Sequence, residues 1–252
     1  MHMIEMTQRG NITVLRMTHG KANALDLELC ETLTTELQAC AASSARALVV
    51  IGQGKMFSAG VDLPRVINGG AEYIRVFLPA VNRMFETLFS FPKPVVAAVN
   101  GHAIAGGCIM ACAVDYRLMA REPGRIGIPE LLVGVPFPVV PLEIMRFAMP
   151  PPSLQSVVYR GTTFTADEAL QQGLVDAVVD PERLEEEALT AAERLAALPA
   201  AAFRLTKRLL REPTLARIRA GAAIDQAVQD NWMSPETLTA IREYVARTLG
   251  KK

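Results

Sequence analysis

The chain has 252 residues, enough for one large domain or for a core with a small appendage. Its 26 lysines and arginines balance 26 aspartates and glutamates, so no global field favours nucleic-acid binding. Charges or prolines interrupt every apolar run before the length of about 18 residues that a membrane span needs, and the N-terminal segment lacks a signal-peptide pattern. The cysteines form no CxxC pair, which argues against zinc. We therefore expect a reduced, cytoplasmic protein with no metal and with no nucleic-acid or membrane partner.

The first half of the chain alternates predicted strands and helices. Asp26 is expected to cap a helix in which leucines recur at every fourth position. A second helix has an apolar stripe over 74–88 and is expected to begin or bend near Pro79. The expected strands are 11–17, 46–52, 93–101 and 115–120. This alternation is typical of an α/β protein.

Two of these strands belong to a repeated pattern. The stretch "LVVIGQGKMFSAG" begins at residue 48 and aligns with "VVAAVNGHAIAGG" at residue 95, a shift of 47 positions. A strand, a polar turn, a loop of small residues and a helix follow one another in both stretches. Such a repeat is expected where supersecondary units stack in a spiral.

The second half of the chain has a different organisation. Prolines divide 128–152 into short pieces, and Thr165 with Glu168 predicts a capping box for a brief helix. An edge strand is expected over 174–180. The expected helices after it are 184–198, 200–211, 214–230 and 235–249. Such a helical tail packs on a neighbouring subunit, covers a site, or completes the core.

Several familiar site types do not fit the sequence. "GQGKMF" has Phe57 where a dinucleotide fingerprint needs its third glycine, and no P-loop motif occurs. "MFSAG" has Met56 in place of the first glycine of a nucleophile elbow, which makes Ser58 a poor candidate nucleophile. His102 lies in a turn and is expected to be structural.

Two glycine-bearing loops and one carboxylate remain as candidates. Backbone N–H groups from both loops could converge on one oxygen and stabilise an enolate or a tetrahedral oxyanion; alternatively, the glycines only allow close packing. Glu130 is the one carboxylate among long apolar flanks. If it is buried there, its pKa should rise towards the range useful for proton transfer; if it begins an exposed helix, it faces solvent.

At these residues the chain resembles the crotonase, or enoyl-CoA hydratase/isomerase, superfamily, over nearly its full length. The stretches that carry the resemblance are "KANALD" (21–26), "FSAGVDL" (57–63), "PVVAAVNGHAIAGGCIMACAVDYRLMA" (94–120), "IGIPELLVGV" (126–135) and "TADEALQQGLVDAVV" (165–179). The resemblance implies a spiral of ββα units with a helical trimerisation region. We accordingly expect a spiral core over 1–195 and an oligomerisation region over 196–252, in a homotrimer or a hexamer made of two trimers.

The resemblance also implies a chemistry. The family binds an acyl-CoA thioester and stabilises the enolate formed at the thioester oxygen, so coenzyme A belongs to the substrate and no separate cofactor is expected. By motif position, the stabilising N–H groups belong to Val61 and Gly106, and Glu130 matches a catalytic glutamate. The residues expected along the CoA moiety are Lys21, Ala22, Ala59, Asp62 and Leu63.

The departures from the family pattern bear on the reaction. Hydratases carry a glutamate where this chain has Ile109, and their GAGGTQR stretch is replaced by "PFPVVPLEIMR". Ile109 is expected either to face the acyl carbons or to pack beneath its helix. One carboxylate suits a Δ3,Δ2-enoyl-CoA isomerase with Glu130 as the single acid and base. The alternatives are hydration by Glu130 alone as in fatty-acid β-oxidation, thioester hydrolysis, decarboxylation, ring cleavage, and a non-catalytic CoA-binding assembly subunit.

Overall fold

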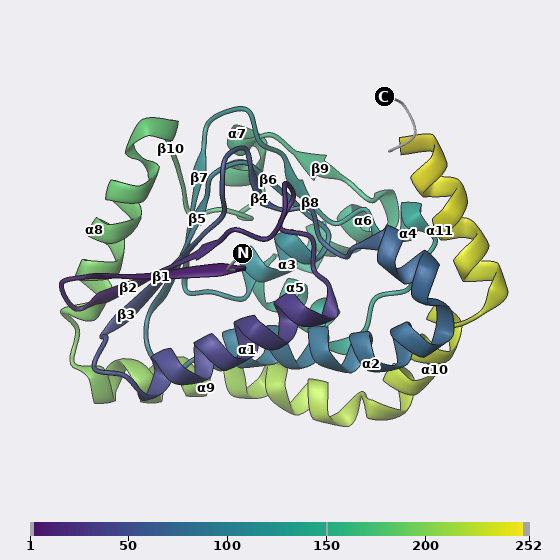
Figure 1. The fold of residues 1–252 in the computed structure, drawn as a ribbon. Coiled ribbons are helices and arrows are strands. Elements are labelled where there is room, and N and C mark those ends of the chain that lie inside the picture. Colours follow the sequence, from purple (N-terminus) through teal and green to yellow (C-terminus); the bar gives the residue numbers. More distant parts are fainter. Residues whose placement is uncertain (1–2, 150, 249–252) are drawn as a thin grey trace.

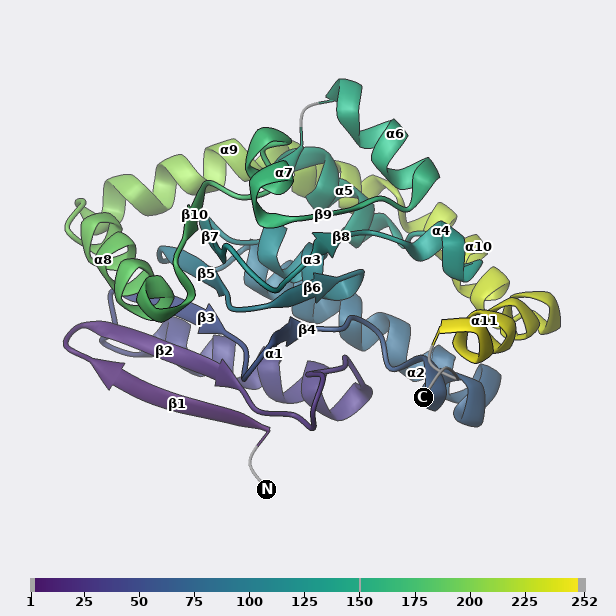
Figure 2. The same cartoon turned by 90° about the horizontal axis from the view of Figure 1, so that it is seen from above.

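In the computed structural model, which describes residues 3–149 and 151–248, two β-sheets lie among helices (Figures 1 and 2). Within these ranges the larger sheet has the strand order β1 (Ile4–Arg9), β2 (Ile12–Met17), β3 (Ala47–Ile51), β5 (Val95–Val99), β7 (Tyr116–Ala120), β10 (Ala177–Val179). The smaller sheet has the order β4 (Met56–Ser58), β6 (His102–Ile104), β8 (Ile126–Gly127), β9 (Thr163–Phe164). All neighbouring strands are parallel except the β1–β2 and β8–β9 pairs.

The repeat in the sequence is the repeat of the fold. Strands β3 and β5 pair in parallel with Leu48 opposite Val95, so the shift of 47 residues is the register of the sheet. Strand β4 then pairs with β6, and each unit continues into a helix, α2 (Leu63–Phe89) or α3 (Gly106–Cys112). The α/β class and the repeated ββα unit are confirmed.

The larger sheet is covered on both faces, so its strands are apolar throughout. Leu48 and Val50 of β3 face the cluster that contains α1 (Leu27–Ala42) and α2. Val49 and Ile51 face α8 (Leu184–Ala196), which lies at the left of the sheet in Figure 1. Since each large apolar side chain contributes roughly 1.5–3 kcal/mol when fully buried, these two clusters hold the layers together.

The expected edge strand over 174–180 is confirmed as β10, but β1 and the strands of the smaller sheet were not predicted. All of β1 after Ile4 is exposed, because this edge strand pairs with β2 through its backbone and buries almost no side chains. Without apolar alternation it leaves no periodic signal. The small sheet consists of strands of two or three residues, which are too short for any period to show.

Two predicted helix boundaries are wrong. The second helix does not begin near Pro79: α2 begins at Leu63, its non-helical residue is Gly70, with φ 57°, and a bend at Pro79 stays a prediction. The predicted break near Pro213 is also absent, since α9 (Ala200–Ala220) runs through this proline. Thr214 and Ile218 after the proline are buried against the core, and this packing holds the helix together across the lost hydrogen bond.

The remaining helices surround the smaller sheet and form the tail. They are α4 (Glu130–Val133), α5 (Val139–Ala148), α6 (Pro151–Arg160), α7 (Ala166–Gln171), the 3₁₀ turn Pro181–Arg183, α10 (Ala222–Trp232) and α11 (Pro235–Thr248). The capping box of α7 is confirmed, since Thr165 N–H donates to Glu168 Oε2 at 2.8 Å and Glu168 N–H to Thr165 Oγ1 at 3.4 Å. No helix in the described ranges has the length and hydropathy to cross a membrane. The domain division at residue 195 stays a prediction.

A buried ionic cluster fixes α9 to the core. Arg211 and Lys207 donate to opposite oxygens of Asp115, at 2.7 and 2.6 Å. Arg211 also donates to the carbonyls of Ala113 and Val114, at 3.0 and 2.9 Å, at the C-terminal end of α3. Both buried cations are thus paired with a carboxylate and hydrogen-bonded, as buried charges require. The tail is therefore attached to the same helix that carries the second glycine loop.

Candidate functional site

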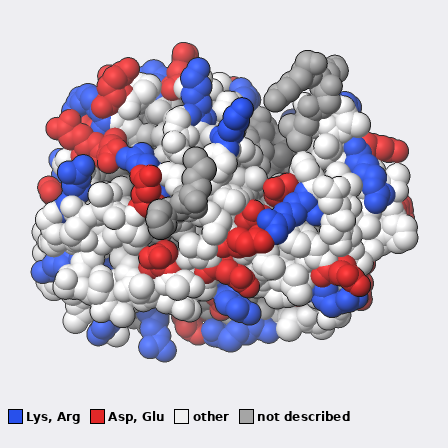
Figure 3. Space-filling model, viewed as in Figure 1, with Lys and Arg blue, Asp and Glu red and all other residues white. Residues whose placement is uncertain are grey.

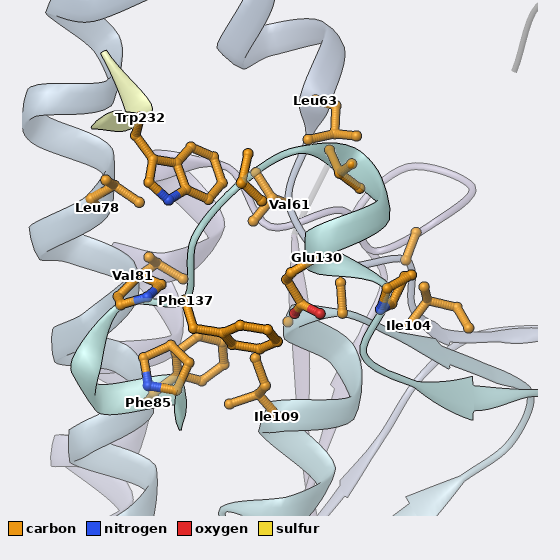
Figure 4. Close-up of a pocket in the computed structure, with 18 of the residues that line it drawn as sticks. Val61, Leu63, Leu78, Val81, Phe85, Ile104, Ile109, Glu130, Phe137 and Trp232 are labelled. Carbon is orange, nitrogen blue, oxygen red and sulfur yellow. The ribbon is translucent and has the colours of Figure 1, made fainter. Parts of the chain in front are cut away.

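A cavity of about 100 Å³ lies between the two ββα units and the tail. Helices α2, α3 and α4 contribute to its wall, and α10 and α11 reach it from the C-terminal end of the chain. Six of the predicted site residues line it: Ala59, Val61, Leu63, Gly106, Ile109 and Glu130. Figure 4 shows the Glu130 carboxylate inside this cavity, near Ile109 and Phe137. The structure therefore brings the two glycine loops and the carboxylate to one place.

Glu130 is buried, which excludes its alternative as a solvent-facing helix start. It is the first residue of α4, follows Pro129, and only 8% of it is exposed. Its Oε2 atom has no hydrogen-bond partner among the described residues. Burial in this apolar wall raises the pKa of Glu130 to about 8, and a hydrogen bond from its own backbone N–H opposes that rise. The expected shift is confirmed, and Glu130 is poised to exchange a proton near neutral pH.

The described part of the cavity wall carries one carboxylate. Among the described residues that line it, Glu130 is the one acidic side chain. Ile109 lies on the first turn of α3, is 2% exposed, and contributes both to the cavity wall and to the hydrophobic core. The two expectations for Ile109 are therefore compatible, because one side chain both packs beneath its helix and faces the cavity.

The first backbone donor is in the loop after β4. Leu25 N–H donates to Gly60 O at 2.8 Å, and Asp62 N–H donates to Leu25 O at 3.0 Å. Because both neighbours of Val61 face Leu25 across a short parallel bridge, the Val61 N–H points away from Leu25. Val61 itself lines the cavity.

The second donor begins a helix. Gly106 is the first residue of α3, where the N–H groups have no partner within the helix. It follows Ala105, which has the strained φ of 52°, and this turn brings Gly106 to the cavity wall. Val61 and Gly106 both line the cavity that also holds the carboxylate, and neither N–H donates to another group among the described residues. Such a set can stabilise negative charge on a substrate oxygen while a proton is moved nearby.

The glycines allow the two loops to approach closely. A Cβ atom on Gly60, which has φ 79°, would lie 2.6 Å from Ile104 O and 3.0 Å from Gly106 N. A Cβ atom on Gly107 would lie 2.3 Å from Ser58 O. Any larger residue would push the loops apart. The close packing given above as one alternative is therefore observed, and the role of the N–H groups towards a ligand stays a prediction.

Three predicted residues lie outside the cavity wall. Lys21 is exposed, and Ala22 accepts the N–H of Ala59 at 3.0 Å, which places their loop beside the first glycine loop. Asp62 caps α2 by accepting the N–H of Arg65 at 3.0 Å. These residues adjoin Ala59, Val61 and Leu63 in the chain or by hydrogen bonding but do not line the cavity themselves, and their contact with the CoA moiety stays a prediction.

The interior has aromatic walls that sequence reasoning missed. Phe85 comes from α2, Phe137 from the proline-rich segment, Trp232 from α10 and Tyr244 from α11. The Trp232 indole N–H donates to Pro136 O at 2.9 Å, which fixes the ring. The apolar stripe of α2 could have indicated Phe85, but nothing in the sequence indicated that the tail returns to the cavity of its own chain.

Neither the surface charge nor a group of metal ligands distinguishes the site in the described part of the chain. Acidic and basic side chains are interspersed over the face shown in Figure 3, in keeping with the net charge of zero. Across residues 3–149 and 151–248, no three histidine, cysteine or acidic side chains are grouped so that they could hold a metal ion. His102 Nδ1 accepts the N–H of Arg125 at 3.3 Å, in a strand outside the cavity. Among the described residues that line the cavity, Glu130 carries the one carboxylate, and none carries a cationic side chain.

Comparison with known proteins assigns a family. The sequence model described as enoyl-CoA hydratase/isomerase matches residues 7–247. The human mitochondrial enoyl-CoA delta isomerase 1 is 28% identical over 219 residues, 86% of this chain and 72% of that protein.

Solved structures agree with this assignment. The human mitochondrial delta3-delta2-enoyl-CoA isomerase superimposes with a TM-score of 0.95 at 26% identity, over 100% of both chains. An enoyl-CoA hydratase from Mycobacterium marinum gives a TM-score of 0.82 at 30% identity, over 90% of this chain and 99% of that one. The fold of this chain is therefore that of both isomerases and hydratases.

Proposed function

The chain belongs to the enoyl-CoA hydratase/isomerase family, and on that premise we propose that it is a Δ3,Δ2-enoyl-CoA isomerase. The observation that carries the proposal is the single carboxylate of Glu130 in an otherwise uncharged cavity that also holds two backbone donors. An isomerase needs one group that first accepts and then returns a proton. A hydratase needs in addition a water molecule held in a fixed position.

The proposed reaction moves a double bond by two proton transfers. Glu130 removes a proton from C2 of a 3-enoyl-CoA, and the electrons of that C–H bond form an enolate conjugated with the existing double bond. The Val61 and Gly106 N–H groups stabilise the negative charge on the thioester oxygen. Glu130 then returns the proton at C4, which leaves the double bond between C2 and C3. No atom is gained or lost, so no co-reactant is needed.

The walls of the cavity favour this reaction over hydration. Ile109 stands where hydratases carry a second glutamate, and it offers no hydrogen-bond acceptor for water. Phe137, Val133 and Val135 line the cavity beside Glu130 and are also apolar. A water molecule beside Ile109 would lack the hydrogen-bond acceptor that a glutamate at this position provides. Binding that water in the cavity would therefore cost free energy. Hydration by Glu130 alone is the second candidate function, supported by the hydratases among the solved relatives.

Substrate binding and assembly are parts of the same proposal. Lys21, Ala22, Ala59, Asp62 and Leu63 bind the CoA moiety, which arrives with the substrate, so the enzyme needs no other cofactor. The isomerase works in the cytoplasm.

The proposed assembly is a homotrimer, or a hexamer made of two trimers, with the helical tail at the interface. Leu205, Leu209 and Leu210 of α9 are each more than half exposed, which supports an apolar contact there. Light scattering at micromolar concentration should show a trimer or hexamer, and a monomer would contradict the proposed assembly.

A panel of acyl-CoA substrates tests the proposed function. The protein is incubated separately with a 3-enoyl-, a 2-enoyl- and a 3-hydroxyacyl-CoA of the same chain length. Liquid chromatography with mass spectrometry then separates the two enoyl isomers and detects hydration as a gain of one water. The proposal expects the two enoyl isomers to interconvert. Binding without turnover would favour a CoA-binding assembly subunit, and release of free CoA would favour thioester hydrolysis.

A further inference from the structure

Ser58 has a place in the site that the proposed mechanism does not use. It is fully buried, at 0% exposure, and it does not line the cavity. Its hydroxyl donates to Asn23 O at 2.7 Å and accepts the N–H of Gly60 at 3.2 Å. Ser58 therefore connects the loop that contains Asn23 to the residue that precedes Val61. Because it is fully buried and lies outside the cavity wall, Ser58 is not available as a nucleophile.

Asn23 completes the same connection from the other side. It is 1% exposed and has φ 44°, a left-handed conformation that asparagine tolerates better than most residues. Its side-chain amide donates to Phe57 O at 3.1 Å and to Met56 O at 3.3 Å, and its Oδ1 accepts the N–H of His19 at 2.8 Å. The Asn23 side chain thus contributes, with the Ser58 hydroxyl, to the conformation of the loop and to its attachment to β4.

We propose that Ser58 and Asn23 are positioning residues that fix the direction of the Val61 N–H. The inference rests on the proposed function, in which this N–H binds the thioester oxygen. The backbone of Leu25 is hydrogen-bonded to both neighbours of Val61, Gly60 and Asp62. The hydrogen bond between Ser58 and Asn23 in turn fixes the segment that carries Leu25. The Gly106 N–H needs no such pair, because the first turn of α3 already sets its direction.

The consequence is an asymmetric pair of donors. One donor is supported by a helix, and the other by a loop that two buried side chains hold in place. Removal of one such donor typically costs about 10²–10³ in kcat. Loosening a donor without removing it should cost less. We therefore expect Ser58→Ala to lower kcat by about 10- to 100-fold, with KM changed by less than about threefold because the CoA moiety is bound elsewhere.

A spectroscopic probe separates this role from a merely structural one. The probe is an enoyl-CoA whose acyl group carries an electron-donating aryl ring in conjugation with the thioester carbonyl. Hydrogen bonds to the carbonyl oxygen draw electron density along the conjugated system and shift its absorption to longer wavelength. The shift reports the two N–H groups without any turnover. Ser58→Ala should lose at least half of the wild-type shift while the dissociation constant of the probe stays within about threefold.

Thr34→Ala is the matched control. Thr34 is also buried, and its hydroxyl donates to Cys30 O at 2.8 Å within α1, away from the cavity. It should lose a comparable buried hydrogen bond and keep the wild-type kcat and shift. Asn23→Gly provides a second test variant if Ser58→Ala does not fold, because glycine adopts the left-handed conformation without the side-chain contacts.

The outcomes are distinct. If Ser58→Ala, or Asn23→Gly in its place, binds the probe with the full wild-type shift and turns over as fast as Thr34→Ala, the positioning role is wrong. If the wild-type protein shifts the probe spectrum and the variant does not, the positioning role stands even when no 3-enoyl-CoA is isomerised. In that second case only the proposed isomerase function fails.

Discussion

Replacing Glu130 by glutamine should make the protein more stable at high pH. Burial raises the pKa of Glu130 from 4.5 to about 8, a difference of about 3.5 between the unfolded and the folded chain. At about 1.4 kcal/mol per unit of pKa, ionised Glu130 costs the folded state about 5 kcal/mol. Glutamine has nearly the same shape and never ionises, so Glu130→Gln removes that cost.

The direction of the pH dependence follows from the protons bound in each state. Between pH 4.5 and 8 the folded chain keeps the Glu130 proton and the unfolded chain releases it. The free energy of unfolding of the wild type therefore falls as pH rises through this window. Relative to Glu130→Gln, the wild type should be less stable by about 1.4 kcal/mol at pH 5.5 and by about 5 kcal/mol at pH 9.

Urea unfolding of both proteins at pH 5.5, 7 and 9 measures the difference. Glu31→Gln, on the exposed face of α1, is the control for replacing a glutamate and should track the wild type at every pH. The turnover of Glu130→Gln should fall by about two to four orders of magnitude, the usual contribution of a general base. A stability difference between wild type and variant that is the same at all three pH values would refute the buried, proton-binding role of Glu130.

Three further predictions concern the base, the cavity wall and the tail. The kcat/KM of the wild type should rise about tenfold per pH unit below a pKa of about 8 and level off above it, because only ionised Glu130 accepts the C2 proton; a flat profile from pH 6 to 9 would contradict this. Ile109→Glu should gain hydration of a 2-enoyl-CoA relative to isomerisation, with some loss of thermal stability from the new buried carboxylate; an unchanged ratio of the two activities would show that Ile109 does not exclude water. Arg211→Met should lower the free energy of unfolding by about 3–5 kcal/mol in urea titration, because it leaves Asp115 buried with one cation; a loss below about 1 kcal/mol would show that the cluster does not hold α9.

The sequence predicted the parts of the fold that repeat or alternate. The shift of 47 residues became the register of β3 on β5, because equal units in a parallel spiral stack strand on strand. The caps at Asp26 and Thr165 were found because capping chemistry is local. The interruption expected in α9 was predicted wrongly. A proline predicts a break in a helix, but at Pro213 the packing of the residues around the proline keeps α9 continuous.

The chemistry of the site was more predictable than its walls. Glu130 was recognisable because an acidic residue among apolar ones is unusual, and its burial is confirmed. Trp232 and Tyr244 could not be assigned to the cavity, because a helix pattern does not say where the helix packs. Asn23 and Ser58 act through backbone groups of distant segments, and such contacts appear only in three dimensions.

The central claim is that the protein is an isomerase because the described residues of its cavity include one carboxylate, Glu130, and no second group to hold an attacking water molecule. The most direct test is the ratio of two initial rates, measured with the wild-type protein at one pH and one chain length. The first rate is formation of 2-enoyl-CoA from 3-enoyl-CoA, followed by the absorbance of the conjugated thioester; the second is formation of 3-hydroxyacyl-CoA from 2-enoyl-CoA. The account predicts that isomerisation is faster by at least about 100-fold, equivalent to about 2.7 kcal/mol in the barriers. Hydration at a rate equal to or above that of isomerisation would contradict it.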